Sequence, residues 1–305
     1  MTSPINMNYY VVDAFTNHPF GGNPAGVVLL DNKLISHNSK CCRIEKNDLF
    51  PNDNLMLNIA AELRYSETAF VRQLSQSQFH VRYFTPVAEV ELCGHATIAT
   101  FSLLRQIGLA AGHYKCRTLA GNLDIDVEER VFMQMATPRI VSTVSDTALI
   151  YKALGIEDYC PLLPVQIAYA GLSDLMIQVS DVDVLNNLQP NMDAISDVTH
   201  KLDAVSFHIF ALADDEYTAH VRDFAPLYGV PEESATGTAN AALAHYLLKH
   251  GVVDNPCECS FLQGTAMGRP SVVVARIATD GNIYIGGSAS VVAEGCLLPN
   301  IRSRI

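Results

Sequence analysis

An internal repeat constrains this chain of 305 residues more than any other feature, because two copies of one unit must fold in the same way. Residues 80–86 (HVRYFTP) match residues 220–226 (HVRDFAP) at five of seven positions. A short acidic loop follows each copy, and then a helical pattern begins with glycine, at Gly94 and at Gly237. The separation grows from 140 residues at the first match to 143 at the glycines, which indicates a longer loop in the second copy.

Around these helical patterns, most of the chain is predicted to form strands. Short runs of β-branched and aromatic residues are bounded by Gly, Asn, Asp or Pro, which is typical of strands and turns. The predicted strands are Tyr9–Phe15, Ala25–Leu30, Thr68–Arg72, Phe79–Phe84, Leu123–Val127, Val131–Met135, Gln166–Tyr169, Leu175–Val179, Ala204–Leu212, Tyr217–Arg222, Ser271–Ile277 and Asn282–Ser288.

Two kinds of helix are predicted. The helices at Asn54–Leu63 and Asp146–Leu154 are amphipathic, whereas those that begin at Gly94 and Gly237 are apolar on all faces. A helix that is apolar all round is buried. The sequence therefore predicts two α+β units, each with many strands enclosing one buried helix.

The boundary between the two units is expected near Ala136–Val144, where Thr137 and Pro138 interrupt the pattern. We predict an N-terminal domain at 1–136 and a C-terminal domain at 137–291, with the segment 292–305 as a candidate addition to the N-terminal domain. The segment Ile35–Asn52 is unusually long before its helix, and the sequence assigns it no role.

Composition excludes several classes of function. Only 17% of the residues are charged and 49% are hydrophobic, which opposes disorder. The net charge of −12 and the scattered basic residues disfavour binding to nucleic acid. No stretch reaches the ~18 uncharged apolar residues of a membrane span, and the first residues lack the pattern of a secretory signal. We expect a soluble cytoplasmic protein, with no membrane or nucleic-acid partner and with mostly reduced cysteines.

The two glycine-led helices are candidate anion sites. A helix N-terminus offers unpaired N–H groups and the positive end of the dipole, which suit a carboxylate or an enolate. If the units are related by pseudo-symmetry, both N-termini are expected to face one cleft between them. The alternative is that both glycines only permit close packing at a helix start, but their duplication favours the anion site.

Titratable and hydroxyl groups occur in the loops before these helices. They are Glu89, Glu91, Cys93 and His95 in the first copy, and Glu232, Glu233, Thr236 and Thr238 in the second. His95 is expected to be neutral, because the helix dipole disfavours imidazolium, and it could then contact substrate. Alternatively, it only caps the turn.

Glu67 is the candidate general acid/base. It follows Ser66 at the mouth of a predicted strand, where a carboxylate would be partly desolvated. The alternative is an ordinary solvated glutamate at the start of a strand. Other catalytic patterns are not found: there is no dinucleotide-binding GxGxxG after a strand, no phosphate-binding loop, no GxSxG elbow and no His/carboxylate set for a metal.

Motifs along nearly the whole chain resemble the PhzF-like phenazine-biosynthesis family. In the first half they are residues 13–16 (DAFT), 20–25 (FGGNPA), 66–71 (SETAFV), 84–86 (FTP) and 91–97 (ELCGHAT). In the second half they are residues 224–226 (FAP), 236–240 (TGTAN), 263–264 (QG), 268–271 (GRPS) and 286–289 (GGSA).

The resemblance implies the diaminopimelate-epimerase-like fold, in which two similar domains each form a barrel-like, mostly antiparallel sheet around a central helix. It also implies a homodimer and proton transfer without a cofactor or metal. In the family's isomerase, a glutamate moves a proton between carbons of dihydro-hydroxyanthranilate, and this glutamate matches Glu67. The resemblance places substrate contacts at Gly94 and His95, and it matches an aspartate and a serine of a family motif with Glu233 and Thr238. We expect Ser66 and Gly237 to bind the substrate as well.

We therefore expect an isomerase that acts on a small carboxylate. Glu233, Ser234 and Thr238 stand where the family has Asp, Pro and Ser, which motivates a second hypothesis: a metabolite-binding or protein-interaction module with weakened catalysis. A two-cysteine epimerase is a third hypothesis. It is disfavoured because Cys93 lies near the first cysteine position of the related racemases, but Thr236 occupies the second.

Overall fold

The computed structural model describes residues 7–30, 50–156, 159 and 161–297. The chain divides into two compact units. Unit 1 comprises Met1–Phe20, Pro24–Met133 and Ser288–Ile305, and unit 2 comprises Gly21–Asn23 and Gln134–Gly287. The change of unit after Met133 lies close to the boundary expected after residue 136. Most of the segment Ile35–Asn52 and the end of the segment 292–305 lie outside the described residues.

The strands of unit 1 pair in an order that starts with the last strand of the chain. The order is β18 (Ala289–Leu297), β1 (Met7–Ala14), β2 (Asn23–Leu29), β3 (Thr68–Gln73), β4 (Gln78–Phe84), β6 (Gly112–Thr118), β7 (Gly121–Val127) and β8 (Val131–Gln134), with the short β5 (Glu89–Val90) beside β4. β2–β3 and β4–β6 are parallel. β18–β1, β3–β4, β6–β7 and β7–β8 are antiparallel.

Unit 2 repeats this arrangement. Its order is β9 (Arg139–Thr143), β10 (Gln166–Tyr169), β11 (Ser173–Gln178), β12 (Phe207–Leu212), β13 (Ala219–Ala225), β15 (Cys257–Gln263), β16 (Ser271–Ile277) and β17 (Ile283–Gly287), with β14 (Val230–Glu233) beside β13. β11–β12 and β13–β15 are parallel. The other pairs with a known register are antiparallel. The repeat in the sequence is therefore a repeat of topology, and the predicted α+β class with two pseudo-symmetric units is confirmed.

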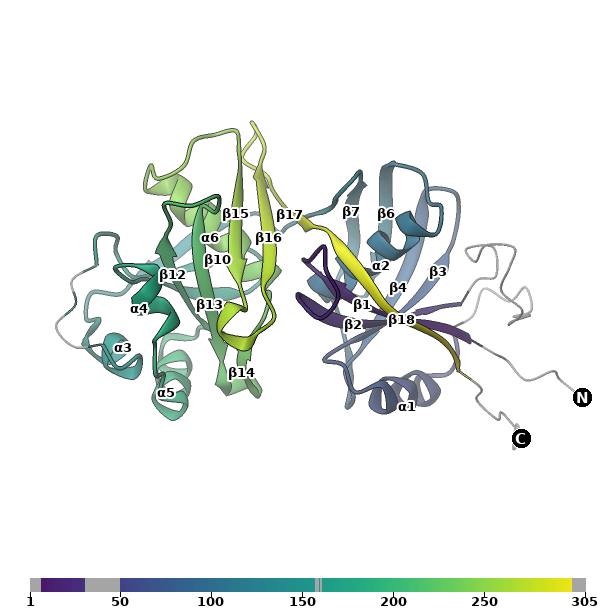
Figure 1. Cartoon of the computed structure of the whole chain (residues 1–305), viewed down its shortest axis with the longest axis horizontal. Coiled ribbons are helices and arrows are strands. Elements are labelled where there is room, and N and C mark those ends of the chain that lie inside the picture. The colour runs from purple at the N-terminus through teal and green to yellow at the C-terminus, as the bar shows by residue number, and fades with distance from the viewer. Residues whose placement is uncertain (1–6, 31–49, 157–158, 160, 298–305) are drawn as a thin grey trace, which may run out of the picture. The chain divides into compact units, whose positions relative to one another are not determined.

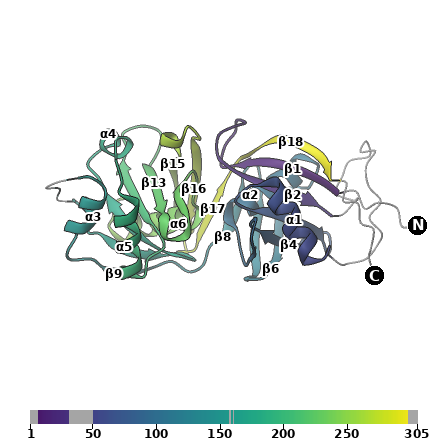
Figure 2. The same ribbon diagram turned by 90° about the horizontal axis from the view of Figure 1, so that it is seen from below.

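Each unit holds one buried helix. α2 (Gly94–Gln106) follows β5 and packs against β1, β3, β7 and β18, and its residues His95–Leu104 are all buried (Figure 1). α6 (Gly237–Lys249) follows β14 and packs against β9, β10, β11, β16 and β17 (Figure 2). Strands from both ends of each sheet contact the helix, so each sheet curls around it as a barrel does. The predicted burial of both helices is confirmed.

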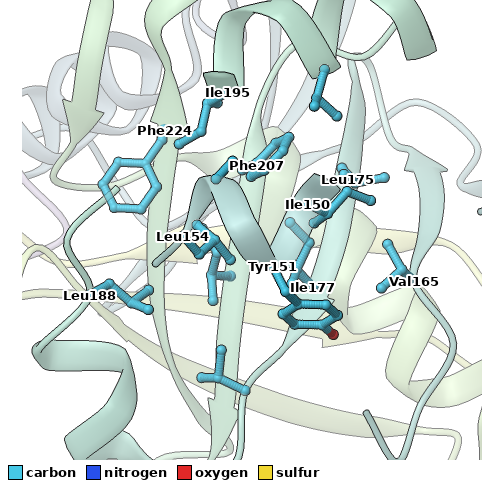
Figure 3. Close-up of a cluster of buried hydrophobic side chains, with 14 of the residues drawn as sticks. Ile150, Tyr151, Leu154, Val165, Leu175, Ile177, Leu188, Ile195, Phe207 and Phe224 are labelled. Carbon is cyan, nitrogen blue, oxygen red and sulfur yellow. The ribbon is translucent and has the colours of Figure 1, made fainter. Parts of the chain in front are cut away.

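The amphipathic helices lie on the outer faces of the sheets. α1 (Asp53–Leu63) packs against β3 and β4 through Met56, Ile59 and Ala60, and the side chain of Asn52 caps its N-terminus. In unit 2, α3 (Ala148–Ala153), α4 (Val182–Asn186) and α5 (Met192–Leu202) surround a hydrophobic cluster that includes Phe207 and Phe224 (Figure 3). Two 3-10 turns, η2 (Pro226–Tyr228) and η3 (Thr265–Met267), complete the described elements.

The repeat extends to an ion pair that fixes the loop before each buried helix. The guanidinium of Arg82 on β4 donates to both carboxylate oxygens of Glu89, at 2.7 and 2.6 Å. The guanidinium of Arg222 on β13 donates to both oxygens of Glu232, each at 2.9 Å. Such two-pronged pairs fix orientation as well as charge, so both loops are held to their sheets in the same way.

No helix in the described part of the chain is long and apolar enough to cross a membrane. Cys93, Cys116, Cys257 and Cys259 are not in disulfides, whereas Cys296 is disulfide-bonded. Burial raises the pKa of both the Cys116 and the Cys259 thiols to about 12, so these two thiols are poor nucleophiles.

Candidate active site

Glu67 lies immediately before β3, where the parallel pairing of β2 and β3 holds its backbone. The carbonyl oxygen of Glu67 accepts a hydrogen bond from the N–H of Gly26 at 3.1 Å. Its side chain is 21% exposed, so the carboxylate lies at the edge of the buried interior. This position combines partial desolvation with access for a small molecule.

His95, the second residue of α2, brings the predicted residues of unit 1 together. Its Nε2 atom lies 3.3 Å from Oε2 of Glu67 and 3.4 Å from Oγ of Ser66. Its Nδ1 atom lies 3.4 Å from Sγ of Cys93. Burial lowers the pKa of His95, and the charge of Glu67 offsets this only in part. His95 is therefore neutral near pH 7, as expected, but the main cause is desolvation rather than the helix dipole.

The Oε2 atom of Glu67 is buried and has no hydrogen bond to any described residue. Its distance to Nε2 of His95 is short, but the alignment does not make a hydrogen bond. A buried acceptor without a donor costs roughly 1–3 kcal/mol, and such atoms call for an explanation such as a catalytic role. A carboxylate oxygen left in this way is available to take a proton.

The N-terminus of α2 lies next to this carboxylate and has no side-chain cap. Cys93 precedes the helix in an extended conformation, with φ −139° and ψ 114°. A Cβ atom placed on Gly94 would meet only the Cε atom of Met133, at an ordinary 3.7 Å. Packing within unit 1 therefore does not require a glycine here, which weakens the alternative that Gly94 serves only close packing.

In unit 2, α6 begins in the same way. Thr236 precedes it in an extended conformation, with φ −119° and ψ 102°, and makes no side-chain cap. A Cβ atom on the buried Gly237 would lie 3.4 Å from Cγ2 of Ile285, a contact that fits without strain. The half-buried Thr238 is the second residue of α6, at the position that His95 has in α2.

Glu233, at the end of β14, is held from two sides. Its Oε1 atom accepts from Nδ2 of Asn23 at 3.0 Å, and its Oε2 atom lies 2.7 Å from the hydroxyl oxygen of Thr236. The Thr236 hydroxyl also lies 3.1 Å from Oδ2 of Asp223. Glu233 is thus joined through one hydroxyl to a second carboxyl.

Sequence reasoning missed Asp223 and the buried polar groups around it. Oδ1 of Asp223 contacts Oγ of Ser206 at 2.7 Å and Nδ1 of His208 at 2.9 Å, and Ser206 also reaches Asp174 at 2.9 Å. All four residues are at most 2% exposed. A signal was present in the repeat itself, because Asp223 stands where the first copy has Tyr83.

The strand pairing identifies equivalent positions in the two units. The N–H of Gly26 donates to the carbonyl of Glu67, and that of Leu175 donates to the carbonyl of Ser206. Ser206 is therefore the counterpart of Glu67 in unit 2. In the same way, Thr236 is the counterpart of Cys93.

The same cluster in unit 1 contains a set of metal-ligand types that the sequence spacing did not reveal. Glu67, Cys93 and His95 each offer one ligand atom, and these atoms all lie within 4.8 Å of one another. Sequence reasoning missed the set because Glu67 precedes β3 whereas the other two residues begin α2. The prediction that the site binds no metal stays a prediction.

A comparison with known protein families matches residues 12–295 to the PhzC-PhzF family, described as phenazine biosynthesis-like protein. The chain belongs to this family. A relative in Escherichia coli K12 named "Uncharacterized isomerase YddE" is 31% identical, over 93% of this chain and 95% of that protein. The trans-2,3-dihydro-3-hydroxyanthranilate isomerase of Pseudomonas fluorescens is 29% identical, over 93% of this chain and 99% of that protein.

Solved structures support the same placement. The crystal structure of a PhzF-family phenazine biosynthesis protein from Bacillus anthracis has a TM-score of 0.80 and 27% identity, covering 96% of this chain and 99% of that one. A hydroxyproline epimerase from Agrobacterium vitis has a TM-score of 0.59 at 12% identity, with 96% and 93% covered, and shares the fold. The epimerase-like fold implied by the sequence motifs is confirmed.

Proposed function

We propose that this protein is a cofactor-independent isomerase that moves a proton on a small carboxylate substrate, with Glu67 as the general acid/base. The observation that carries the proposal is the buried Oε2 atom of Glu67, which has no hydrogen bond among the described residues and lies 3.3 Å from the neutral His95. A carboxylate with one unengaged oxygen can accept a proton from carbon without first breaking a hydrogen bond.

The chemistry balances without a cofactor. Glu67 takes a proton from one carbon of the substrate and returns a proton to another, and the proton exchanges with solvent while the carboxyl holds it. No electron carrier is needed. The neutral His95 offers a hydrogen bond to the negatively charged intermediate. An imidazolium would instead form an ion pair with the intermediate and hold it too tightly. Uncapped N–H groups at the start of α2 suit the developing oxyanion or the substrate carboxylate.

We further propose that Ser66, Gly94, His95, Glu233, Gly237 and Thr238 bind the substrate, and that the protein acts as a homodimer. The substrate class is a small cyclic or amino-acid-like carboxylate. The family membership and the relative named trans-2,3-dihydro-3-hydroxyanthranilate isomerase support this class. Glu233 and Thr238 carry the carboxyl and hydroxyl chemistry of the family's Asp and Ser on side chains of different shape, which favours a related substrate over an identical one.

The test measures the exchange of solvent deuterium into the substrate. The protein is incubated in deuterated water with dihydro-hydroxyanthranilate and a panel of related carboxylates, and NMR detects the exchange. The wild type is expected to catalyse exchange, and Glu67→Gln is expected to abolish it while the circular dichroism spectrum stays native. Glu62→Gln, on the exposed side of α1, is the matched control and should exchange like the wild type.

Exchange retained by Glu67→Gln would overturn the assignment of Glu67. Binding by the wild type without exchange across the whole panel would instead favour the metabolite-binding module.

A further inference from the structure

Three carboxyl groups of unit 2, those of the buried Asp174 and Asp223 and the half-buried Glu233, are linked by hydroxyl groups into one chain. Oγ of Ser206 lies 2.9 Å from Oδ1 of Asp174 and 2.7 Å from Oδ1 of Asp223. The hydroxyl of Thr236 lies 3.1 Å from Oδ2 of Asp223 and 2.7 Å from Oε2 of Glu233. Three carboxyl groups are therefore joined by four short oxygen–oxygen contacts through two hydroxyls.

These contacts require more protons than the hydroxyls possess. A hydroxyl carries one proton and can donate to one of its two carboxyl neighbours at a time. For all four contacts to be hydrogen bonds, one proton must lie on a carboxyl beside Ser206 and another on a carboxyl beside Thr236. The chain therefore holds two carboxyl protons in the fully bonded state.

The first of these protons belongs to Asp174. Burial raises the pKa of Asp174 well above its ordinary value, and the charge of Asp223 adds to this effect. The protonated Asp174 donates to Oγ of Ser206, and the Ser206 hydroxyl then donates to Asp223. With its proton on Nδ1, His208 is a second donor to the same oxygen of Asp223.

The second proton lies between Asp223 and Glu233. Gln263 donates through Nε2 to the Thr236 oxygen at 3.1 Å, so this hydroxyl has one lone pair left to accept a further proton. We propose that Asp223, Thr236 and Glu233 share one proton. Glu233 in unit 2 is then a second acid–base group besides Glu67 in unit 1, and the buried Asp223 stores its proton.

The relay conserves both charge and protons. In one state, Glu233 carries the proton and donates to Thr236, whose hydroxyl donates to the ionised Asp223. In the other state, Asp223 carries the proton, and the Thr236 hydroxyl donates to the ionised Glu233. Donors stabilise the charge of both carboxyls, because Oδ1 of Asp223 accepts from Ser206 and His208 and Oε1 of Glu233 accepts from Asn23, so the proton is shared between the two states.

This inference rests on the proposed function only for the contact between Glu233 and substrate. Asp223 and Thr236 act through Glu233 and are positioning residues. Two amide side chains also face the relay: Asn23, which donates to Oε1 of Glu233, and Gln263. Their amides do not titrate, so they cannot supply the shared proton.

The test is infrared spectroscopy of the carbonyl stretch of protonated carboxyl groups at pH 7, because ionised carboxylates absorb elsewhere. The wild type is expected to show two such bands from these residues. Asp174→Asn should remove one band, since the amide can still donate to Ser206, and Glu233→Gln should remove the other. Thr236→Val should remove or shift the second band, whereas Thr236→Ser should keep it.

Kinetics separate a proton relay from a merely structural contact. In the pH profile of kcat/KM, the limb assigned to Glu233 is expected to move by at least one pH unit in Thr236→Val and to stay in place in Thr236→Ser. A wild-type spectrum that Glu233→Gln leaves unchanged would overturn the shared proton. Because the bands are read without substrate, they can persist when Glu67→Gln retains exchange, so failure of the proposed function and failure of the relay give different results.

Discussion

The two units hold equivalent backbone positions but place their carboxyl groups differently. In unit 1, the position before β3 is Glu67, whose side chain is 21% exposed and lies beside a neutral histidine. In unit 2, the equivalent residue is the fully buried Ser206, and the carboxyl has moved to Asp223 on the neighbouring strand, 2% exposed and bonded to several donors. Unit 1 therefore has a carboxylate with one oxygen outside any hydrogen bond among the described residues, whereas the equivalent carboxyl of unit 2 belongs to a hydrogen-bond network.

This difference shows how a duplicated fold can separate two roles. A group that must exchange protons with a substrate gains from few fixed hydrogen bonds, because each bond must be broken during transfer. A buried group that shares a proton through neighbouring hydroxyls gains from many hydrogen bonds, because buried polar networks are stable only when their members are satisfied. The four predictions below test this contrast, from the largest expected effect to the smallest.

The largest effect is expected from replacing each of the two equivalent residues, Glu67 and Ser206, in turn. Glu67→Gln should lower kcat by about 10²–10⁴-fold, the usual contribution of a general acid/base. Ser206→Ala should lower kcat far less, because Ser206 contacts only the buried carboxyls of Asp174 and Asp223 among the described residues and is not proposed to contact the substrate. Steady-state kinetics on the substrate found by the deuterium-exchange panel would measure both. Equal losses would contradict the division of roles between the units.

The second prediction concerns the two equivalent ion pairs. Arg222 also donates to the carbonyl of Leu185 at 3.2 Å, so its loss leaves Glu232 and a buried carbonyl without partners. Arg222→Met should reduce the free energy of unfolding by about 3–5 kcal/mol. Arg82→Met should cost about 1–3 kcal/mol, since Glu89 lies closer to solvent and can be hydrated.

Urea denaturation of both variants measures these costs. A larger loss of stability in Arg82→Met than in Arg222→Met would contradict the prediction. It would indicate a stabilising contribution from the exposed Asp53, which also pairs with Arg82 at 2.9 Å.

The third prediction is that titration of the two units affects stability in opposite directions. The pKa of His95 is lowered in the fold, so its contribution is complete above pH 6.5 and is lost as the pH falls towards its folded pKa. The pKa of Asp174 is raised, so its contribution is complete below pH 3.8 and is lost as the pH rises towards its folded pKa. A difference of one between the folded and unfolded pKa values corresponds to about 1.4 kcal/mol of unfolding free energy.

Unfolding free energies at several pH values would separate the two effects. Relative to the wild type, His95→Gln should lose less stability between pH 7 and pH 5, and Asp174→Asn should lose less between pH 4 and pH 7. A wild-type pH dependence that Asp174→Asn does not change would show that Asp174 is not held neutral.

Much of the fold was predictable because its signals are local or repeated. The all-apolar patterns after Gly94 and Gly237 predicted both buried helices, and the duplicated motif predicted the matching topology. Strands such as β6 were missed because their burial alternates with charged residues, so no apolar run stands out. α5 was also missed, although Ile195 and Val198 supply the apolar spacing of an amphipathic helix.

The candidate site was predictable only in part. The motifs identified Glu67 and His95 separately, but their proximity depends on where β3 starts relative to α2, which is a tertiary property. The partners of Asp223 lie just before β12 (Ser206), on β12 (His208) and just before α6 (Thr236), so no spacing along the chain could assemble them. Aspartate is rarely buried without a partner, so an aspartate in a strand is predicted to be exposed as long as its hydrogen-bond donors are unknown.

The smallest effect on stability is expected at the two helix starts. Gly94→Ala should change the free energy of unfolding by less than about 1 kcal/mol, because the added Cβ meets only Met133, at 3.7 Å. Gly237→Ala should behave similarly, since Cγ2 of Ile285 lies 3.4 Å away. If these glycines let a substrate carboxylate approach the backbone N–H groups, KM should nevertheless rise about tenfold in each variant, equivalent to about 1.4 kcal/mol of binding. An unchanged KM together with unchanged stability would mean that neither packing nor anion binding accounts for the duplicated glycine, and a loss of stability would restore the packing explanation.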